Sequence, residues 1–177
     1  LLQGDALHAQ EAVLNPARTS ALWLPQIAQL RNPRLVKSLA GSLRQRNIVC
    51  MENTAVTALE IEKGAIRGVR TSQSHFRAEK VVIAGGAWSA NIIQQSARPP
   101  HIQPVKGQMI LFKAEAGMLK SIILSQGRYL IPRRDGRILA GSTLEYTAFD
   151  KSTSVSALQE LSSAAISLVP DLDKVVI

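Results

Sequence analysis

The sequence predicts an α/β (α+β) fold, and three local patterns carry this prediction. A helix-forming stretch at 32–47 leads through a tight turn into a short apolar segment at 48–51, as in half of a crossover unit. A β-branched run at 80–84 ends in two glycines and is followed by a second helical stretch. The segment 134–137 contains Asp-Gly, a strong signal for an antiparallel hairpin.

The composition of the 177 residues limits the class of protein. Apolar residues make up 46% of the chain, which is enough for a hydrophobic core and excludes wholesale disorder. The single cysteine, Cys50, excludes an intramolecular disulfide and a cysteine-cluster metal site. It fits a reducing compartment, so we expect a cytoplasmic protein. The apolar runs are far shorter than the ~20 residues that a membrane span needs, so we expect no membrane partner.

The formal net charge of +8 leaves two interpretations open, a solvated basic surface or a surface that binds anions. Aromatic residues are 4% of the chain, so the stacking platform of single-strand binders is missing. We therefore do not expect nucleic acid as a partner, although a basic nucleic-acid-binding module remains the alternative from another class. The sequence leaves a homo-oligomer open.

The first quarter of the chain is expected to begin irregularly and then to form a helix and a strand. Two Xaa-Pro pairs interrupt any periodicity in residues 1–30. Asn32 is expected to cap a helix that has Pro33 in its first turn, and Asn47 suits the helix end. The apolar residues of this helix recur at helical spacing: Leu35, Val36, Leu39, Ala40 and Leu43. The segment 48–51 follows as a short buried strand.

The next segment predicts a small β-meander, a parallel strand and a helix. The meander strands are expected at 55–61, 66–71 and 75–77, with Lys63-Gly64 as the first turn. The run 80–84 is typical of a central parallel strand, and a helix is expected over 90–96.

Pro99-Pro100 marks a boundary, after which four strands and a helix are expected. The strands are predicted at 108–113, 121–124, 129–132 and 137–140. Ser154 is expected to cap a helix over 155–168 that ends before Pro170, and 174–177 is expected to begin another strand.

Few residues carry chemistry by pattern alone. The glycines after the strand at 80–84 either let a ligand approach the backbone or only permit close packing of strand and helix. Tyr129 is either a donor to a substrate carboxylate or a packing residue. Neither a G-x-G-x-x-G turn nor a phosphate-binding loop occurs in the 177 residues. The three histidines lack metal-ligand spacing, and no serine lies in the context of a hydrolase nucleophile.

Five segments occur in a characteristic order and spacing, at 52–56, 81–89, 104–109, 129–137 and 140–145. Together they resemble the FAD-dependent glycine oxidase and D-amino-acid oxidase family, and in particular the glycine oxidases that serve synthesis of the thiamine thiazole. The resemblance implies two interleaved lobes. Residues 1–30 and 99–177 would form a substrate-binding lobe with a mixed, largely antiparallel sheet and helices. Residues 31–98 would form part of a Rossmann-like FAD-binding lobe.

The resemblance also implies roles for individual residues. Tyr129 would donate a hydrogen bond to the substrate carboxylate, and Leu144 would line the substrate pocket. The flavin would be contacted at Val56, Ala84, Gly85, Gly86 and Trp88. No metal is implied, and no side chain of this chain is implied as a catalytic acid or base.

The activity implied is oxidation of glycine or another small amino acid to the imino acid, with FAD as cofactor and O2 as electron acceptor. A D-amino-acid dehydrogenase, a sarcosine-type oxidase or a tRNA-modifying FAD oxidoreductase remain alternatives with the same fold. The pyrophosphate-binding G-x-G-x-x-G and the family's carboxylate-clamping arginine do not fall within these residues. We therefore expect a piece of a longer polypeptide that by itself binds no FAD and is inactive.

Overall fold

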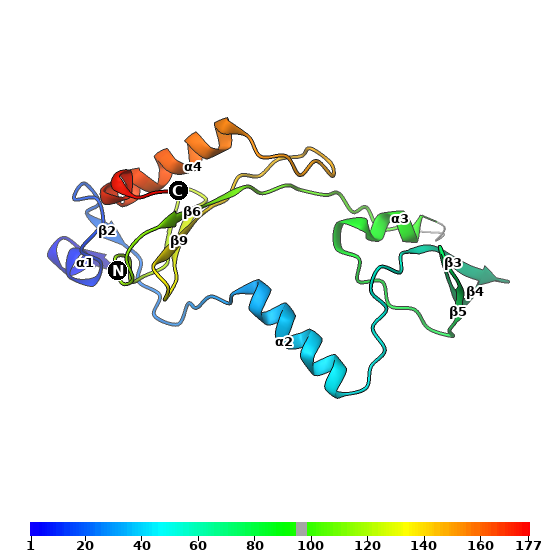
Figure 1. Ribbon diagram of the computed structural model, residues 1–177. Helices are drawn as coiled ribbons and strands as arrows, with labels where there is room; N and C mark the ends of the chain where they lie inside the picture. The colour runs from blue at the N-terminus through cyan, green and yellow to red at the C-terminus, as the bar shows by residue number, and fades with distance from the viewer. Residues whose placement is uncertain (95–98) are drawn as a thin grey trace. The chain divides into compact units, whose positions relative to one another are not determined.

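The computed structural model describes residues 1–94 and 99–177, which divide into two compact units (Figure 1). Unit 1 comprises Leu1–Gln29 and Lys106–Ile177, and unit 2 comprises Leu30–Val105. Each unit has its own antiparallel sheet and its own helices. Among the described helices, none combines the length and the apolar character that crossing a membrane requires.

Unit 1 is built on a four-stranded antiparallel sheet with the order β6-β9-β8-β7. Its strands are β6 (Met109–Lys113), β7 (Ile123–Ser125), β8 (Arg128–Pro132) and β9 (Arg137–Gly141). Helix α4 (Val155–Leu168) packs against β6, β8 and β9 and is followed by a 3-10 turn (Pro170–Lys174). The strands, α4 and its Ser154 cap agree with the sequence prediction to within two residues.

Strand alternation places the core of unit 1 between the sheet and α4. Successive side chains of a strand point to opposite faces, so every second residue faces the helix. Those that do are buried together with the apolar stripe of α4, in a cluster that includes Ile110, Phe112, Leu130, Ile138, Ala140, Leu161, Ala165 and Leu168. Two tight turns connect the strands, one with Gln126-Gly127 at positive φ and one with Gly136 at φ 85°.

The N-terminal segment is more regular than predicted. Residues 1–30 contain β1 (Leu2–Gln3), which pairs with β2 (Ser20–Ala21), and the short helix α1 (Asp5–Gln10). The buried carboxylate of Glu11 accepts hydrogen bonds from the backbone N–H groups of Lys120 (3.0 Å) and Ser121 (2.7 Å). This long-range anchoring of the segment on unit 1 is not visible in a local sequence pattern.

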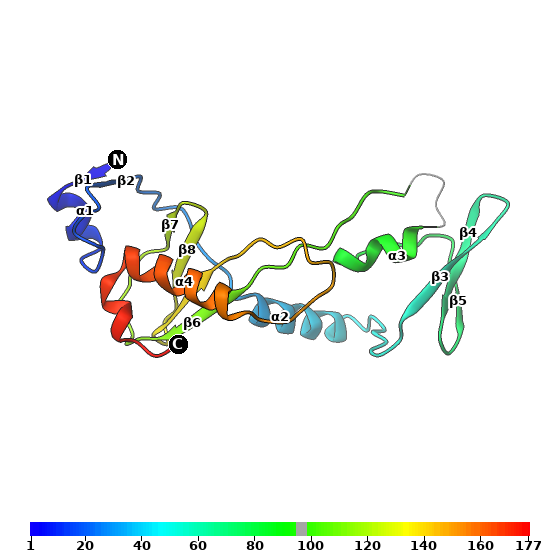
Figure 2. The same ribbon diagram turned by 90° about the horizontal axis from the view of Figure 1, so that it is seen from above.

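Unit 2 contains helix α2 (Asn32–Gln45), a three-stranded meander and a short helix α3 (Ser89–Ile93). The meander strands are β3 (Val56–Glu62), β4 (Ala65–Thr71) and β5 (His75–Arg77), which lie side by side in chain order (Figure 2). Lys63 and Gly64 both have positive φ and form the predicted turn. Helix α3 packs against β3 and follows a 3-10 turn (Gly86–Trp88).

Two predicted strands, at 48–51 and 80–84, are wrong. Neither segment is a strand, and Val49 and Val82 are 84% and 90% exposed. A strand exists only where its backbone groups pair with a neighbour, and in the described part of the chain no strand pairs with either segment. The residues of both segments suit a buried strand, but a local sequence pattern does not show whether a partner strand is present.

Three smaller expectations also need correction. Asn32 is the first residue of α2 rather than its cap, because the Arg31 carbonyl accepts from the N–H groups of Arg34 and Leu35. The segment 174–177 forms no strand, and one hydrogen bond from the Lys113 N–H to the Val176 carbonyl joins it to β6. The helix expected over 90–96 is α3, and residues 95–96 of that prediction lie outside the described residues.

The turn between β8 and β9 provides a test of the fold. A Cβ at Gly136 would lie 2.4 Å from the Ala114 carbonyl oxygen, whereas a Cβ at Gly127 (φ 74°) would meet nothing within 4 Å. Left-handed backbone alone costs an L-residue about 1–2 kcal/mol. We expect Gly127→Ala to cost about that much, and Gly136→Ala to cost at least about 1 kcal/mol more through the added clash. Urea unfolding of both variants measures the difference, and equal losses would contradict it.

Candidate functional site

The open face of the β6-β9-β8-β7 sheet, opposite α4, carries the residues of interest in unit 1. Four residues pair across the strands in one row, Leu124 with Tyr129, Tyr129 with Gly141, and Gly141 with Met109. Their neighbours Ile110, Leu130 and Ala140 are buried toward the helix. By strand alternation the side chains of Leu124, Tyr129 and Met109 therefore share the opposite face. This row is called the Tyr129 row below.

Tyr129 is half-buried and lies across the neighbouring strand. Its hydroxyl donates a hydrogen bond to Met109 Sδ at 3.1 Å. A Cβ on Gly141 would be 2.6 Å from the Tyr129 hydroxyl oxygen and 2.7 Å from Cζ. The phenol therefore passes over Gly141 on β9 and reaches Met109 on β6.

Leu144 lies three residues beyond Gly141 in the segment that follows β9. Its side chain is 66% exposed, while Thr143 before it is buried and Glu145 after it is half-buried. Both flanking side chains take part in a polar network, so Leu144 is presented to the surface of unit 1. The structure places Tyr129 and Leu144 in the same unit.

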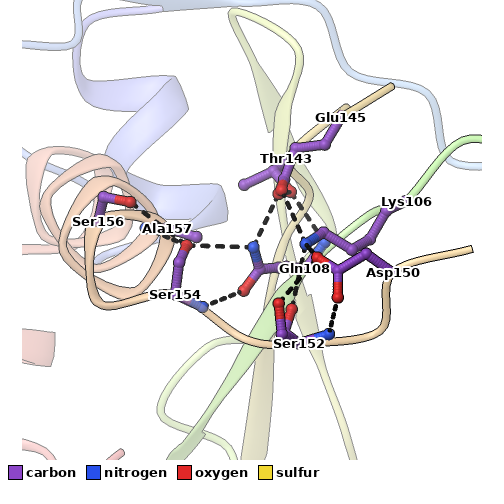
Figure 3. A network of polar contacts seen from close by, with 9 residues as sticks. All are labelled: Lys106, Gln108, Thr143, Glu145, Asp150, Ser152, Ser154, Ser156 and Ala157. Carbon is purple, nitrogen blue, oxygen red and sulfur yellow. Dashed lines mark hydrogen bonds and ion pairs between the residues drawn. The ribbon is translucent and has the colours of Figure 1, made fainter. Parts of the chain in front are cut away.

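A network of polar side chains fixes the ends of β6 and β9 (Figure 3). The Lys106 ammonium lies 3.1 Å from Glu145 Oε2 and 3.0 Å from Asp150 Oδ2, and its side chain is 13% exposed. The hydrogen bonds that the Lys106 ammonium donates to Asp150 and then to Glu145 raise the pKa of Lys106. Hydrogen bonds from Thr143, then Gln108, together with Lys106, lower the pKa of Glu145. Both shifts favour the charged forms of Lys106 and Glu145.

Gln108 connects this network to the start of α4. Its amide nitrogen donates to Glu145 Oε1 (2.8 Å) and to Ser154 Oγ (3.2 Å), and its amide oxygen accepts from the Ser154 N–H (2.9 Å). Ser154 Oγ in turn accepts from the Ala157 N–H as the helix cap. Since Gln108 precedes Met109 in the chain, the network sets the position of the residue that contacts Tyr129.

The residues expected to contact flavin all lie in unit 2. Val56 begins β3, and Ala84, Gly85, Gly86 and Trp88 immediately precede helix α3, which packs on β3. All of them except Gly85, which is half-buried, are exposed.

The two glycines of this segment differ in the space around them. A Cβ at Gly86 would meet nothing within 4 Å, so the backbone there is open to a ligand. A Cβ at Gly85 would lie 3.3 Å from Ser89 Oγ, so this glycine permits close packing onto α3. The packing explanation therefore applies to Gly85, and the approach of a ligand at Gly86 stays a prediction.

The sequence alone did not indicate Met109, Gly141 or the polar network as neighbours of Tyr129. Met109 and Gly141 fall in the segments 104–109 and 140–145 that carried the resemblance. Only the strand register shows that they lie in one row with Tyr129. Within residues 1–94 and 99–177 no cluster of three His, Cys, Asp or Glu side chains could hold a metal ion.

Comparison with known proteins finds similarity along the whole chain. The DAO family, described as FAD dependent oxidoreductase, matches residues 1–177. Glycine oxidase of Pseudomonas putida is 43% identical over 162 residues, which are 91% of this chain and 44% of that protein. The bifunctional protein ThiO/ThiG of Synechocystis is 31% identical over 155 residues, 85% of this chain and 23% of that protein.

Solved structures agree with the sequence relatives. The crystal structure of glycine oxidase from Bacillus cereus superposes with a TM-score of 0.92 at 29% identity, covering 98% of this chain and 49% of that one. The predicted fold class is confirmed by this likeness. The chain spans less than half the length of the curated relatives it matches.

The network predicts a pH-dependent stability. The N–H and hydroxyl of Ser152, with Lys106, lower the pKa of Asp150 from 3.8 to about 2. A carboxylate whose pKa is lower in the folded state stabilises the fold above its ordinary pKa, and this contribution is lost as the pH falls toward 2. We expect the stability difference between the wild type and Asp150→Asn to be constant above about pH 5 and to shrink between about pH 4 and 2.

Urea unfolding at several pH values measures this difference. Asp171→Asn serves as the control, because Asp171 pairs with Lys174 at an exposed position outside the network. A difference for Asp150→Asn that does not change with pH would contradict the prediction.

Proposed function

This chain belongs to the family of FAD dependent oxidoreductases, and on that premise we propose that the whole protein is an amino-acid oxidase of the glycine oxidase type. It would oxidise glycine or another small amino acid to the imino acid with O2 as acceptor. The observation that carries the proposal is the 43% identity to a glycine oxidase along 91% of this chain. The similarity to proteins named ThiO/ThiG supports a role of the product in thiamine thiazole synthesis.

We assign the two units to the two expected lobes. Unit 1 would bind the substrate, and unit 2 would supply part of the FAD-binding lobe. The backbone at Val56 and at Ala84-Gly85-Gly86 would contact the flavin, with Trp88 nearby, because these positions are grouped around β3 and α3 and most are exposed. Bound FAD would supply the acceptor for the hydride of the substrate Cα.

The residues of unit 1 would orient the substrate and keep water away from it. The Tyr129 hydroxyl would donate a hydrogen bond to the substrate carboxylate, which aims the Cα–H bond. Leu144 would form an apolar wall of the pocket. The open sheet face around the phenol carries apolar side chains such as Met109, Leu111 and Leu139, which favour a dry site.

The partners follow from this activity. The enzyme would take a small amino acid and O2, and we propose a cytoplasmic location from the single cysteine and the relatives' activity.

Substrate turnover tests the proposed reaction. The whole protein is mixed with glycine, sarcosine or D-alanine, first without oxygen to follow bleaching of the flavin and then with oxygen to follow peroxide. Bleaching followed by peroxide production supports the oxidase. Bleaching without peroxide would identify a dehydrogenase, and no bleaching by any of the three would overturn the proposal.

The substrate role of Tyr129 gives a specific prediction. Losing one hydrogen bond to a charged group costs roughly 1.5–3 kcal/mol, so Tyr129→Phe is expected to raise KM about tenfold or more with flavin still bound. The other tyrosine of this chain, Tyr146, is exposed and provides the matched control Tyr146→Phe. Steady-state kinetics on the whole protein measure both, and an unchanged KM for Tyr129→Phe would remove Tyr129 from the site.

Residues 1–177 alone are expected to carry no FAD and to show no oxidase activity. The G-x-G-x-x-G turn that would hold the cofactor's pyrophosphate does not occur in them. Visible absorbance of the purified polypeptide, before and after incubation with FAD, measures this. A yellow protein with bound flavin would refute the expectation.

A further inference from the structure

The Tyr129 row contains a glycine, Gly141, whose position is crowded by side chains from the neighbouring strands. Gly141 is a strand residue, and its φ lies outside the left-handed region that favours glycine. It is the last residue of β9, and the space that a side chain would take there is already filled.

The phenol of Tyr129 occupies this space. A Cβ at Gly141 would have the Tyr129 hydroxyl oxygen, its Cζ and Met109 Cγ within 3 Å, at 2.6, 2.7 and 2.9 Å. The ring cannot lie over β9 if residue 141 carries a side chain. It reaches two strands away from its own backbone position, from β8 to β6.

The contact at the far end is with a weak acceptor. The Tyr129 hydroxyl donates to the thioether sulfur of Met109 at 3.1 Å. A thioether accepts hydrogen bonds weakly, whereas a carboxylate forms bonds about twice as strong as those between neutral groups. Met109 is 53% exposed, and its contact with the Tyr129 hydroxyl is itself exposed. A carboxylate that arrives there can accept the hydrogen bond of the Tyr129 hydroxyl in place of the sulfur.

We propose that Met109 is a positioning residue for substrate binding, which with the space above Gly141 holds the Tyr129 phenol ready and releases its hydrogen bond to the incoming carboxylate. This inference rests on the proposed substrate role of Tyr129. Met109 acts through the phenol: it sets the direction of the hydroxyl, and the weakness of the thioether keeps the cost of the exchange small.

The test uses two substitutions of Met109. One introduces a stronger hydrogen-bond acceptor, and the other removes the acceptor. Met109→Gln has a similar length and places an amide, a strong acceptor and donor, beside the phenol, where it competes with the substrate. Met109→Leu keeps the apolar volume and removes the acceptor. In the whole protein we expect Met109→Gln to raise KM for glycine about tenfold and Met109→Leu about threefold or less, with kcat within about twofold in both.

Repeating both substitutions in the Tyr129→Phe background tests the mechanism. Without a hydroxyl there is no hydrogen bond to compete for, so the two Met109 variants are expected to have the same KM within about twofold. The dissociation constant of acetate, a carboxylate without an amine to oxidise, is measured from the flavin spectrum and should follow the same pattern without turnover.

The control lies in the same row. Leu124 flanks Tyr129 on the side away from Met109 and is exposed, so Leu124→Gln introduces the same amide without reaching the hydroxyl. We expect it to leave KM and the acetate dissociation constant unchanged within about twofold.

The outcomes separate the two claims. If Tyr129→Phe raises KM but the two Met109 variants differ as much without the hydroxyl as with it, the inference on Met109 is wrong while Tyr129 keeps its role. Equal KM values for Met109→Gln and Met109→Leu beside an intact Tyr129 also overturn the inference. If Tyr129→Phe changes neither KM nor acetate binding, the proposed role of Tyr129 fails, and with it that of Met109.

Discussion

The packing of α4 on one face of the four-stranded sheet determines which side chains the other face can offer. Phe112, Leu130 and Ile138 are almost fully buried against the helix. Because side chains alternate along a strand, their neighbours must face away from it. A slip of one residue in the register would bury Tyr129 and expose core side chains, so the hydrophobic core itself specifies where the phenol lies.

A network of polar and charged side chains holds the ends of β6 and β9. Gln108 precedes Met109, and Thr143 follows Gly141 by two residues, so the polar network is anchored directly beside the Tyr129 row. Through Ser154 the network also caps α4. The helix that packs the core and the strands that present the phenol therefore share one set of hydrogen bonds. A change in the network would alter both at once, which links the stability of unit 1 to the geometry of its open face.

Local signals predicted the elements that depend on neighbours in the chain. The hairpin with Gly136, the Ser154 cap and the meander are of this kind. The segments 48–51 and 80–84 failed because a strand depends on a partner strand, which in the described residues is not there. The candidate site divides in the same way. A resemblance of linear segments predicted a role for Tyr129, but its contact with Met109 arises from the register of β8, β9 and β6, which no single segment contains.

Charge and the proposed binding chemistry are kept apart in unit 1. Lys106 is paired with Glu145 and Asp150, and Arg128 bonds to the Ser142 carbonyl and to Glu160. Tyr129 and Met109 present a phenol and a thioether, neither of which is charged. The net charge of +8 acts on a small anion over a distance and is screened by salt. At the Tyr129 row the proposed carboxylate would meet one neutral donor, the Tyr129 hydroxyl, so this row would contribute the position of a hydrogen bond and no charge.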